Sequence, residues 1–184
     1  MTDLCDHQPP EREDSVVLVD ALDNELGTAP LLQAHREGAL HRAVSIFLYD
    51  RAGRMLIQRR AAAKYHSGGL WSNTACTHPR PGENPHRAAQ RRLGEEMGLE
   101  TPLNHAFVVL YHADVGEGLI EHELDHIYTG TTSRNPDPDP REVMDWRWIT
   151  PGELRLELQE QPGLFTPWFR LIAPRLLERG GAGE

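Results

Sequence analysis

The stretch NPHRAAQRRLGEEMG, residues 84–98, indicates the fold class because it places one helix between two groups of strands. Asn84 followed by Pro85 is typical of a helix start, and Gly98 stands where the glycine that ends a helix usually lies. Apolar side chains recur every four residues between these ends, at Ala89, Leu93 and Met97. We therefore predict a helix with one face against a core.

Patterns typical of strands flank this helix on both sides. The predicted strands are 41–49 and 54–60 before it, and 107–113, 121–129 and 143–149 after it. Thr150 begins a capping box, and Thr166 precedes a proline, so two further helices are expected near the C-terminus. This order predicts a single α/β (α+β) domain over residues 15–179, with disordered tails at 1–14 and 180–184.

Charge and cysteine content limit the function classes. Nineteen Lys and Arg against 28 Asp and Glu give a net charge of −9, which argues against a nucleic-acid binder. The chain has no apolar run long enough to span a membrane, and its first residues do not form a secretory signal. Cys5 and Cys76 cannot build a disulfide framework. We therefore expect a cytoplasmic protein that binds neither nucleic acid nor membrane.

Two glutamates lie on one predicted strand. Glu121 and Glu123 share a face because side chains alternate along a strand, and they are roughly 7 Å apart along the backbone. Two like charges on an apolar strand are costly unless a cation or a proton lies between them. A solvated strand face explains the pattern equally well. His122 and His126 point to the opposite face and are not counted as ligands of this site.

Basic and nucleophilic side chains gather around the irregular stretch 61–83. Arg59, Arg60 and Lys64 could bind a diphosphate, although a charged surface is the simpler interpretation. Cys76 is either a buried inert thiol or, beside polar neighbours, a reactive one.

On the predicted helix, Arg92 and Glu96 are four residues apart. They form either a surface ion pair or an arginine for phosphate beside a carboxylate for Mg²⁺.

Together these segments resemble the type I isopentenyl-diphosphate isomerase family of the Nudix superfamily. The resemblance rests on APLLQAHREGALHRAVSIFLYD, LIQRRAAAKYHSGGLWSNTACTHPRPGE, RRLGEEMG, IEHELDHIY, EVMDWRWITPGEL and FTPWF. The string W-[ST]-N-x-x-C-x-H-P with a distant E-x-E is highly specific. The resemblance implies a Nudix-like α/β/α sandwich with a mixed sheet. It also implies an isomerase of isoprenoid biosynthesis that interconverts isopentenyl and dimethylallyl diphosphate by metal-dependent protonation and deprotonation.

The resemblance further implies a role for each site residue. The ligands of one divalent metal, Mn²⁺, Mg²⁺ or Zn²⁺, would be His35, His41, His78, Glu121 and Glu123. Glu96 would bind a second ion, Mg²⁺, that accompanies the substrate. The contacts of the diphosphate would be Arg60, Lys64 and Arg92. Cys76 and Glu123 would form the acid/base pair, assisted by Tyr111, and Trp168 would lie over the reacting carbons.

Two departures from the family pattern define the alternatives. Thr77 and Arg92 stand where a complete Nudix box has a glycine and an acidic residue, which weakens the alternative of a Nudix-type diphosphate hydrolase. Leu31 replaces a phosphate-binding lysine of the family, so we expect weaker diphosphate binding or a substitute cation such as Arg36. This replacement is also the support for a third hypothesis, a non-catalytic binder. The expected partner is a small prenyl diphosphate, bound by a monomer.

Overall fold

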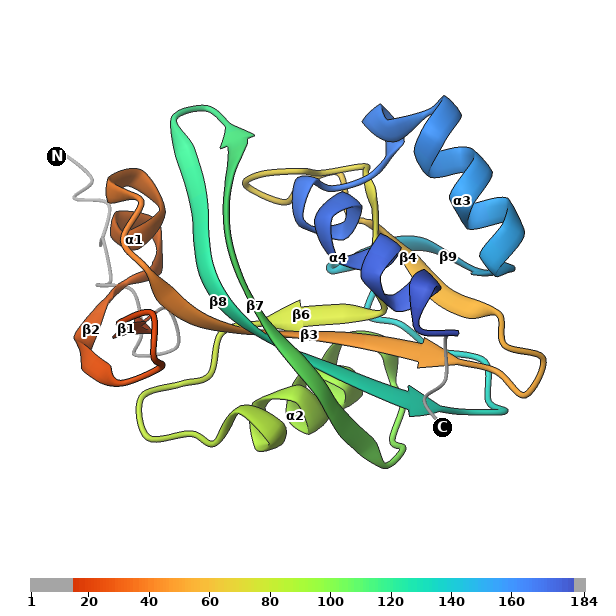
Figure 1. Cartoon of the computed structure of the whole chain (residues 1–184), viewed down its shortest axis with the longest axis horizontal. Helices are drawn as coiled ribbons and strands as arrows, with labels where there is room; N and C mark the ends of the chain where they lie inside the picture. Colours follow the sequence, from red (N-terminus) through yellow and green to blue (C-terminus); the bar gives the residue numbers. More distant parts are fainter. Residues whose placement is uncertain (1–14, 181–184) are drawn as a thin grey trace, which may run out of the picture.

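Strand β3 (His41–Tyr49) is the centre of the fold, because all of its residues are buried. In the computed structural model, which describes residues 15–180, β3 belongs to a nine-stranded mixed sheet. It pairs in parallel with β8 (Leu119–Thr131), in a register that sets His41 opposite Glu123. It also pairs antiparallel with β1, β4 and β6 (Figure 1).

The remaining elements extend the sheet or cover it. The other strands are β1 (Ser15–Val19), β2 (Glu25–Pro30), β4 (Met55–Arg60), β5 (Trp71–Ser72), β6 (Ala75–Thr77), β7 (Leu103–Gly116) and β9 (Val143–Ile149). The helices are α1 (Leu31–Glu37), α2 (Pro85–Met97), α3 (Pro151–Glu160) and α4 (Pro167–Glu178), with a short 3-10 helix at Pro162–Leu164. Strand β7 pairs with β8, and β9 with β4.

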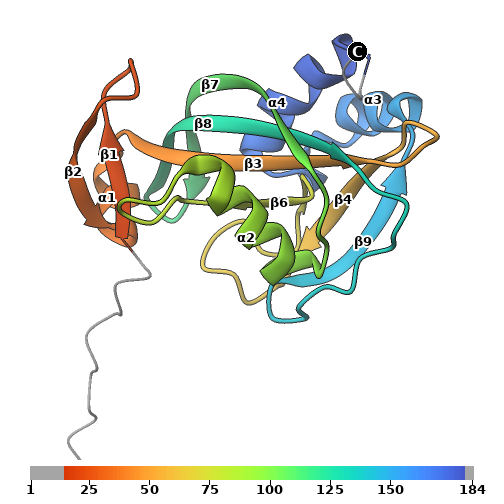
Figure 2. The same cartoon turned by 90° about the horizontal axis from the view of Figure 1, so that it is seen from below.

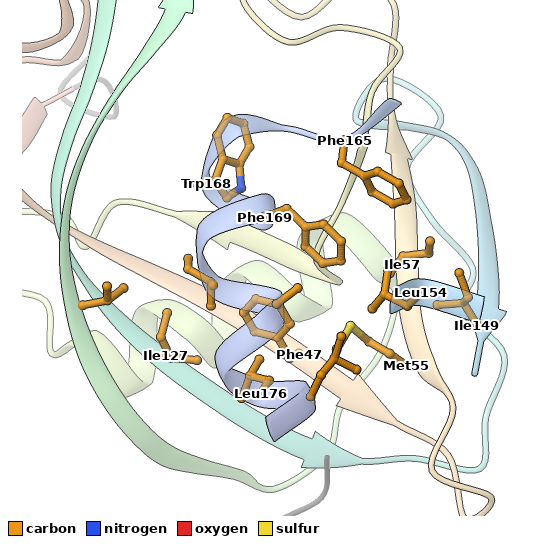
Figure 3. Close-up of a cluster of buried hydrophobic side chains, with 14 of the residues drawn as sticks. Phe47, Met55, Ile57, Ile127, Ile149, Leu154, Phe165, Trp168, Phe169 and Leu176 are labelled. Carbon is orange, nitrogen blue, oxygen red and sulfur yellow. The ribbon is translucent and has the colours of Figure 1, made fainter. Parts of the chain in front are cut away.

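Helices lie on both sides of this sheet, as Figure 2 shows: α2 covers one side, and α3 and α4 the other. Since side chains alternate along β3, Val44 and Leu48 pack toward α2, whereas Phe47 and Tyr49 pack toward α4. The α4 side holds a large buried cluster, with Trp168 among its labelled residues (Figure 3). The predicted α/β/α sandwich with a mixed sheet is therefore confirmed.

Helix α2 has the ends that the sequence predicts. The Asn84 side chain accepts a hydrogen bond from the backbone N–H of His86, 2.9 Å away. Gly98 ends the helix at φ 62°, and a Cβ there would lie 2.5 Å from the Asp137 carbonyl oxygen. Only glycine combines this left-handed backbone with so close an approach. The helix holds Glu96 almost completely buried.

Other parts of the chain differ from the sequence prediction. Strand β2 and helix α1 were not predicted: β2 is mostly exposed and lacks apolar alternation, and α1 has seven residues and no side-chain cap. The irregular stretch 61–83 contains the short strands β5 and β6, and β7 and β8 extend beyond their predicted bounds. Strand β6 forms by pairing with β3, about 30 residues earlier in the chain, which a local pattern does not encode. The predicted tails lie outside the described residues, except for Gly180.

Candidate active site

Three imidazoles and two carboxylates converge at one end of the paired strands β3 and β8. His41 begins β3, His35 lies on α1, His78 follows β6, and Glu121 and Glu123 lie on β8. One donor atom from each of these residues lies within 4.8 Å of the donors of the others. His78 Nε2 is 2.8 Å from Glu123 Oε1, and His41 Nε2 is 3.5 Å from the same oxygen. The structure thus brings together all five residues of the predicted metal site.

The donor set fits a divalent cation. His35 Nε2 and His41 Nε2 are buried and have no hydrogen-bond partner among the described residues. His41 Nδ1 lies 2.8 Å from the Ala39 carbonyl oxygen; since a carbonyl only accepts, Nδ1 carries the proton and the Nε2 lone pair faces the cluster. Burial and the neighbouring His78 lower the pKa of His35 to about 4, which keeps its ring neutral, as a metal ligand must be.

The two glutamates also need a positive partner. Burial and the charge of Glu123 raise the pKa of Glu121 well above its ordinary value. Burial acts in the same direction on Glu123, but its contact with Glu121 and its hydrogen bond with His78 hold its pKa well below the ordinary value. Without a cation, only one of the two carboxylates is therefore readily ionised. A bound cation would stabilise the negative charge of the other as well. A buried His/Glu cluster of this kind is compatible with a divalent metal.

A cavity of about 270 Å³ adjoins this cluster. Its wall includes Cys76, Tyr111, Glu123 and Trp168, which are the predicted catalytic residues and the aromatic residue. The predicted diphosphate contacts Arg60, Lys64 and Arg92 line the same cavity. These seven residues come from six separate segments of the chain and surround one space.

The protonation states of Cys76 and Glu123, the predicted acid/base residues, differ. Burial raises the pKa of the Cys76 thiol to about 12, despite the opposing effect of Arg60, so the thiol is neutral at pH 7. The Tyr111 hydroxyl donates a hydrogen bond to Glu123 Oε2. Burial, together with Glu123, also raises the pKa of Tyr111, which keeps the phenol a donor. The cavity thus holds a neutral thiol and an ionisable carboxylate with a phenol beside it.

Trp168 is held in a defined orientation. Its indole Nε1 donates to Asn73 Oδ1 over 3.1 Å, and Asn73 is itself fully buried between β5 and β6. The Arg60 guanidinium carbon lies 5.2 Å from the centroid of the indole ring. A cation at this distance is attracted by the negative face of the ring. The Trp168 ring is therefore placed where it can stabilise positive charge.

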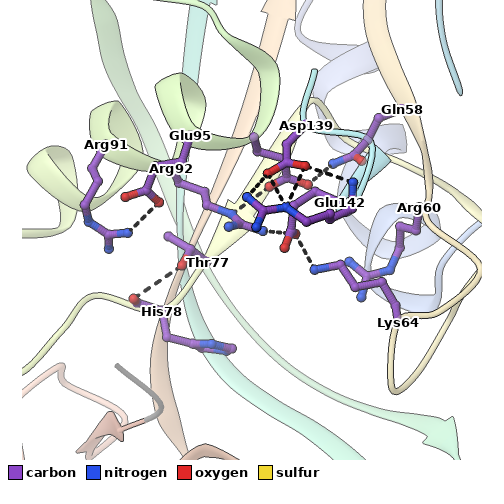
Figure 4. Close-up of polar contacts among 12 residues, drawn as sticks. Gln58, Arg60, Lys64, Thr77, His78, Arg91, Arg92, Glu95, Asp139 and Glu142 are labelled. Carbon is purple, nitrogen blue, oxygen red and sulfur yellow. Dashed lines mark hydrogen bonds and ion pairs between the residues drawn. The ribbon is translucent and has the colours of Figure 1, made fainter. Parts of the chain in front are cut away.

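Cations and carboxylates alternate at the other end of the cavity (Figure 4). Lys64 Nζ and Arg92 Nη2 both donate to Glu142 Oε2. Arg92 Nε also lies 2.7 Å from Glu96 Oε2, while Gln58 Nε2 donates to Glu96 Oε1 over 2.5 Å. Glu96 lies behind Arg92 and is not among the described residues that line the cavity.

Other expectations from the sequence have clear outcomes. His122 and His126 lie outside the metal cluster: His122 Nδ1 contacts the Gly38 carbonyl oxygen, and His126 contacts Asp23. Leu31 lines the cavity, whereas Arg36 is exposed and absent from the described cavity wall. No substitute cation is therefore found at Arg36.

Sequence reasoning missed three polar residues of the site. His66 Nε2 lies 3.1 Å from Glu121 Oε1, and its ring packs edge-on against Trp168. Asp125 is fully buried and accepts a hydrogen bond from Ser45 Oγ. Glu142 bridges two cations. The alternation of Glu121 and Glu123 continues to Asp125 and could have indicated it, but His66 and Glu142 carry no local signal.

Known proteins share the domain of this chain and are similar to it in sequence. The chain matches the NUDIX domain family over residues 39–169. It is 48% identical over 175 residues to isopentenyl-diphosphate Delta-isomerase 2 of Aromatoleum aromaticum, covering 92% of this chain and 93% of that protein. The chain belongs to the isopentenyl-diphosphate Delta-isomerase family. A second member, from Photorhabdus laumondii, is 45% identical and covers 87% of this chain and 90% of its own length.

Solved structures support the fold of this isomerase family member. DR0079 from Deinococcus radiodurans aligns with a TM-score of 0.72 at 19% identity, over 88% of this chain and 98% of that one. The MutT protein from Methanosarcina mazei aligns with a TM-score of 0.62 at 16% identity, over 78% and 96%. At these identities the likeness concerns the Nudix fold alone.

The remains of the Nudix box have a structural use in this isomerase family member. Arg91 lies 2.8 Å from a carboxylate oxygen of Glu83 and 3.0 Å from one of Glu95, so these box residues form an ion-pair network at the surface of α2. Arg92, in place of the acidic residue of the box, turns toward Glu142 instead.

No helix in the described part of the chain has the length and apolar character to cross a membrane.

Proposed function

We propose that this protein interconverts isopentenyl and dimethylallyl diphosphate. The observation that carries the proposal is the cavity whose wall contains the Cys76 thiol, the Glu123 carboxylate and the Trp168 ring together with the cations Arg60, Lys64 and Arg92. Relatives named as isopentenyl-diphosphate Delta-isomerases align over nearly the whole chain and support the same conclusion. The substrate is a small prenyl diphosphate.

The reaction moves a double bond by adding one proton and removing another. The alkene of isopentenyl diphosphate takes a proton at its terminal carbon, which leaves a tertiary carbocation, and loss of a proton from the adjacent CH₂ gives the allylic isomer. The neutral Cys76 thiol can give a proton, and the ionised Glu123 carboxylate can accept one. In the reverse direction their roles exchange. We assign these two residues as the acid/base pair, with Tyr111 positioned by its hydrogen bond to Glu123.

The carbocation needs stabilisation without a nucleophile. Trp168, which is 3% exposed, presents an aromatic ring to the cavity, and a desolvated cation–π contact contributes about 2 kcal/mol. The hydrogen bond from the Trp168 indole N–H to Asn73 fixes the direction in which the Trp168 ring faces.

In this proposal the diphosphate with its Mg²⁺ and the metal of the His/Glu cluster lie on opposite sides of the reacting carbons. Arg60, Lys64 and Arg92 would bind the diphosphate, and the Glu96 carboxylate, now paired with Arg92, would hold the Mg²⁺ that accompanies it. The cluster of His35, His41, His78, Glu121 and Glu123 holds Mn²⁺, Mg²⁺ or Zn²⁺. A metal bound there supplies positive charge that keeps both carboxylates ionised.

The test is incubation with isopentenyl diphosphate and Mg²⁺ in D₂O. Deuterium in the prenyl carbons, together with dimethylallyl diphosphate, is the expected result. Phosphate release without deuterium incorporation would identify a hydrolase, and diphosphate binding without any conversion would identify a non-catalytic binder. The same assay on the Cys76→Ala variant controls for contaminating activity. Cytoplasmic location and a monomeric state stay predictions.

A further inference from the structure

Glu142 is a carboxylate in a place where the proposed function requires cations. It lines the cavity together with Lys64 and Arg92, and one of its oxygens, Oε2, accepts hydrogen bonds from both. The side chain is 24% exposed, close to the 20% and 19% of its two partners. All three groups therefore remain accessible from the cavity.

The backbone holds Glu142 at this position. Its N–H donates to the Asp139 carbonyl and its carbonyl accepts from the Ala61 N–H, with distances of 3.0 Å and 2.9 Å. This second bond ties the start of β9 to the segment that carries Lys64. The carboxylate is also charged: burial would raise its pKa, but Lys64 and Arg92 lower it below the ordinary value. Glu142 is thus a fixed negative charge beside the cavity.

We propose that Glu142 is a specificity-determining residue that makes this site select a diphosphate bound to Mg²⁺ over a free anion. The inference rests on the proposed function, which assigns Lys64 and Arg92 to the diphosphate. Because Glu142 and the nearby Glu96 offset most of the charge of Arg60, Lys64 and Arg92, the cavity offers a free anion only weak net attraction. A diphosphate that carries Mg²⁺ has less negative charge, so the offsetting carboxylates weaken its binding much less.

The test measures binding of inorganic diphosphate by titration calorimetry, once with a chelator and once with Mg²⁺. Glu142→Gln keeps the shape and the hydrogen-bond acceptor but removes the charge. We expect this variant to bind metal-free diphosphate about tenfold more tightly than the wild type, equivalent to ~1.4 kcal/mol. Its dependence on Mg²⁺ falls by the same factor. Glu95→Gln is the matched control: Glu95 lies on the same helix as Arg92 but pairs with Arg91 and does not line the cavity, so its neutralisation leaves both affinities unchanged.

Three outcomes overturn the inference. If Glu142→Gln binds metal-free diphosphate as the wild type does, or more weakly, the carboxylate organises the cations instead of offsetting them. A loss of affinity confined to the Mg²⁺ titration would make Glu142 a metal ligand. If the wild type binds diphosphate in neither titration, the inference about Glu142 has no basis. Circular dichroism of each variant checks that it is folded. A second variant, Glu142→Ala, also removes the charge and should bind metal-free diphosphate more tightly in the same way. Failure of the proposed function is separately visible, as wild-type protein that does not convert isopentenyl diphosphate.

Discussion

The orientation of Trp168 depends on one buried amide, and this dependence can be measured. Asn73 is completely buried; its Oδ1 accepts from Trp168 Nε1 at 3.1 Å and from Ser72 Oγ at 2.9 Å, and its Nδ2 donates to the Ala75 carbonyl at 2.6 Å. Asn73→Ala leaves the indole N–H without a partner and removes the amide hydrogen bond to the Ala75 carbonyl. A buried polar group without a partner costs about 1–3 kcal/mol, and the loss of one further hydrogen bond about 1 kcal/mol. We therefore expect the free energy of unfolding to fall by about 2–4 kcal/mol, a large share of the total for a domain.

A double-mutant cycle isolates the contribution of the indole. Trp168→Phe removes the N–H, so that Asn73→Ala no longer leaves a buried donor unpaired on that side. In the Phe background the Asn73→Ala cost should therefore be smaller by about 1–3 kcal/mol, measured by urea unfolding followed by circular dichroism. If the double variant loses as much unfolding free energy as the two single variants together, within about 0.5 kcal/mol, the two side chains act independently and the reasoning is refuted.

Three further perturbations test the site. Cys76→Ala and Glu123→Gln should each reduce turnover by orders of magnitude with unchanged circular dichroism, and near-normal turnover in either variant would exclude its role as acid or base. Chelation should abolish isomerisation and added Mg²⁺ or Mn²⁺ should restore it, measured by product formation; full activity after exhaustive chelation would argue against the His/Glu metal site. In metal-free protein, the pKa of His35 lies at about 4 when folded and near 6.5 when unfolded, so the unfolded chain binds the proton first as pH falls. Stability should decrease by about 3 kcal/mol between pH 6.5 and 4, and a His35→Asn variant with an equally steep decrease would contradict this account.

Helix α2 shows what local sequence can predict. Its cap at Asn84, its proline start and its terminal Gly98 all act within one or two turns, so the spacing of residues along the chain is sufficient. The long strands were predicted for the same reason, because alternation is a local property. The predicted site residues line one cavity or the adjoining His/Glu cluster, except for Glu96, which lies behind Arg92. Their roles came from resemblance, because local pattern alone left each of them ambiguous.

The residues that were missed depend on long-range contacts. His66 reaches Glu121 from an irregular loop in which Gly68 passes so close to Ala62 that a Cβ would lie 2.6 Å from its carbonyl oxygen. Glu142 meets Lys64 across 78 positions of the chain. Neither contact has a periodic signal, because each is set by how separate segments pack.

The amino-acid sequence by itself determined the fold class, the helix α2 and the main strands, since hydrophobic spacing and capping residues act over a few positions. Tertiary structure alone decided that β3 and β8 lie in parallel with His41 opposite Glu123, that α1 carries His35 to the same place, and that Glu142 faces two cations. Such a register follows from burying one shared face of the sheet, and the free energy of that burial belongs to the whole assembled core and not to any one segment.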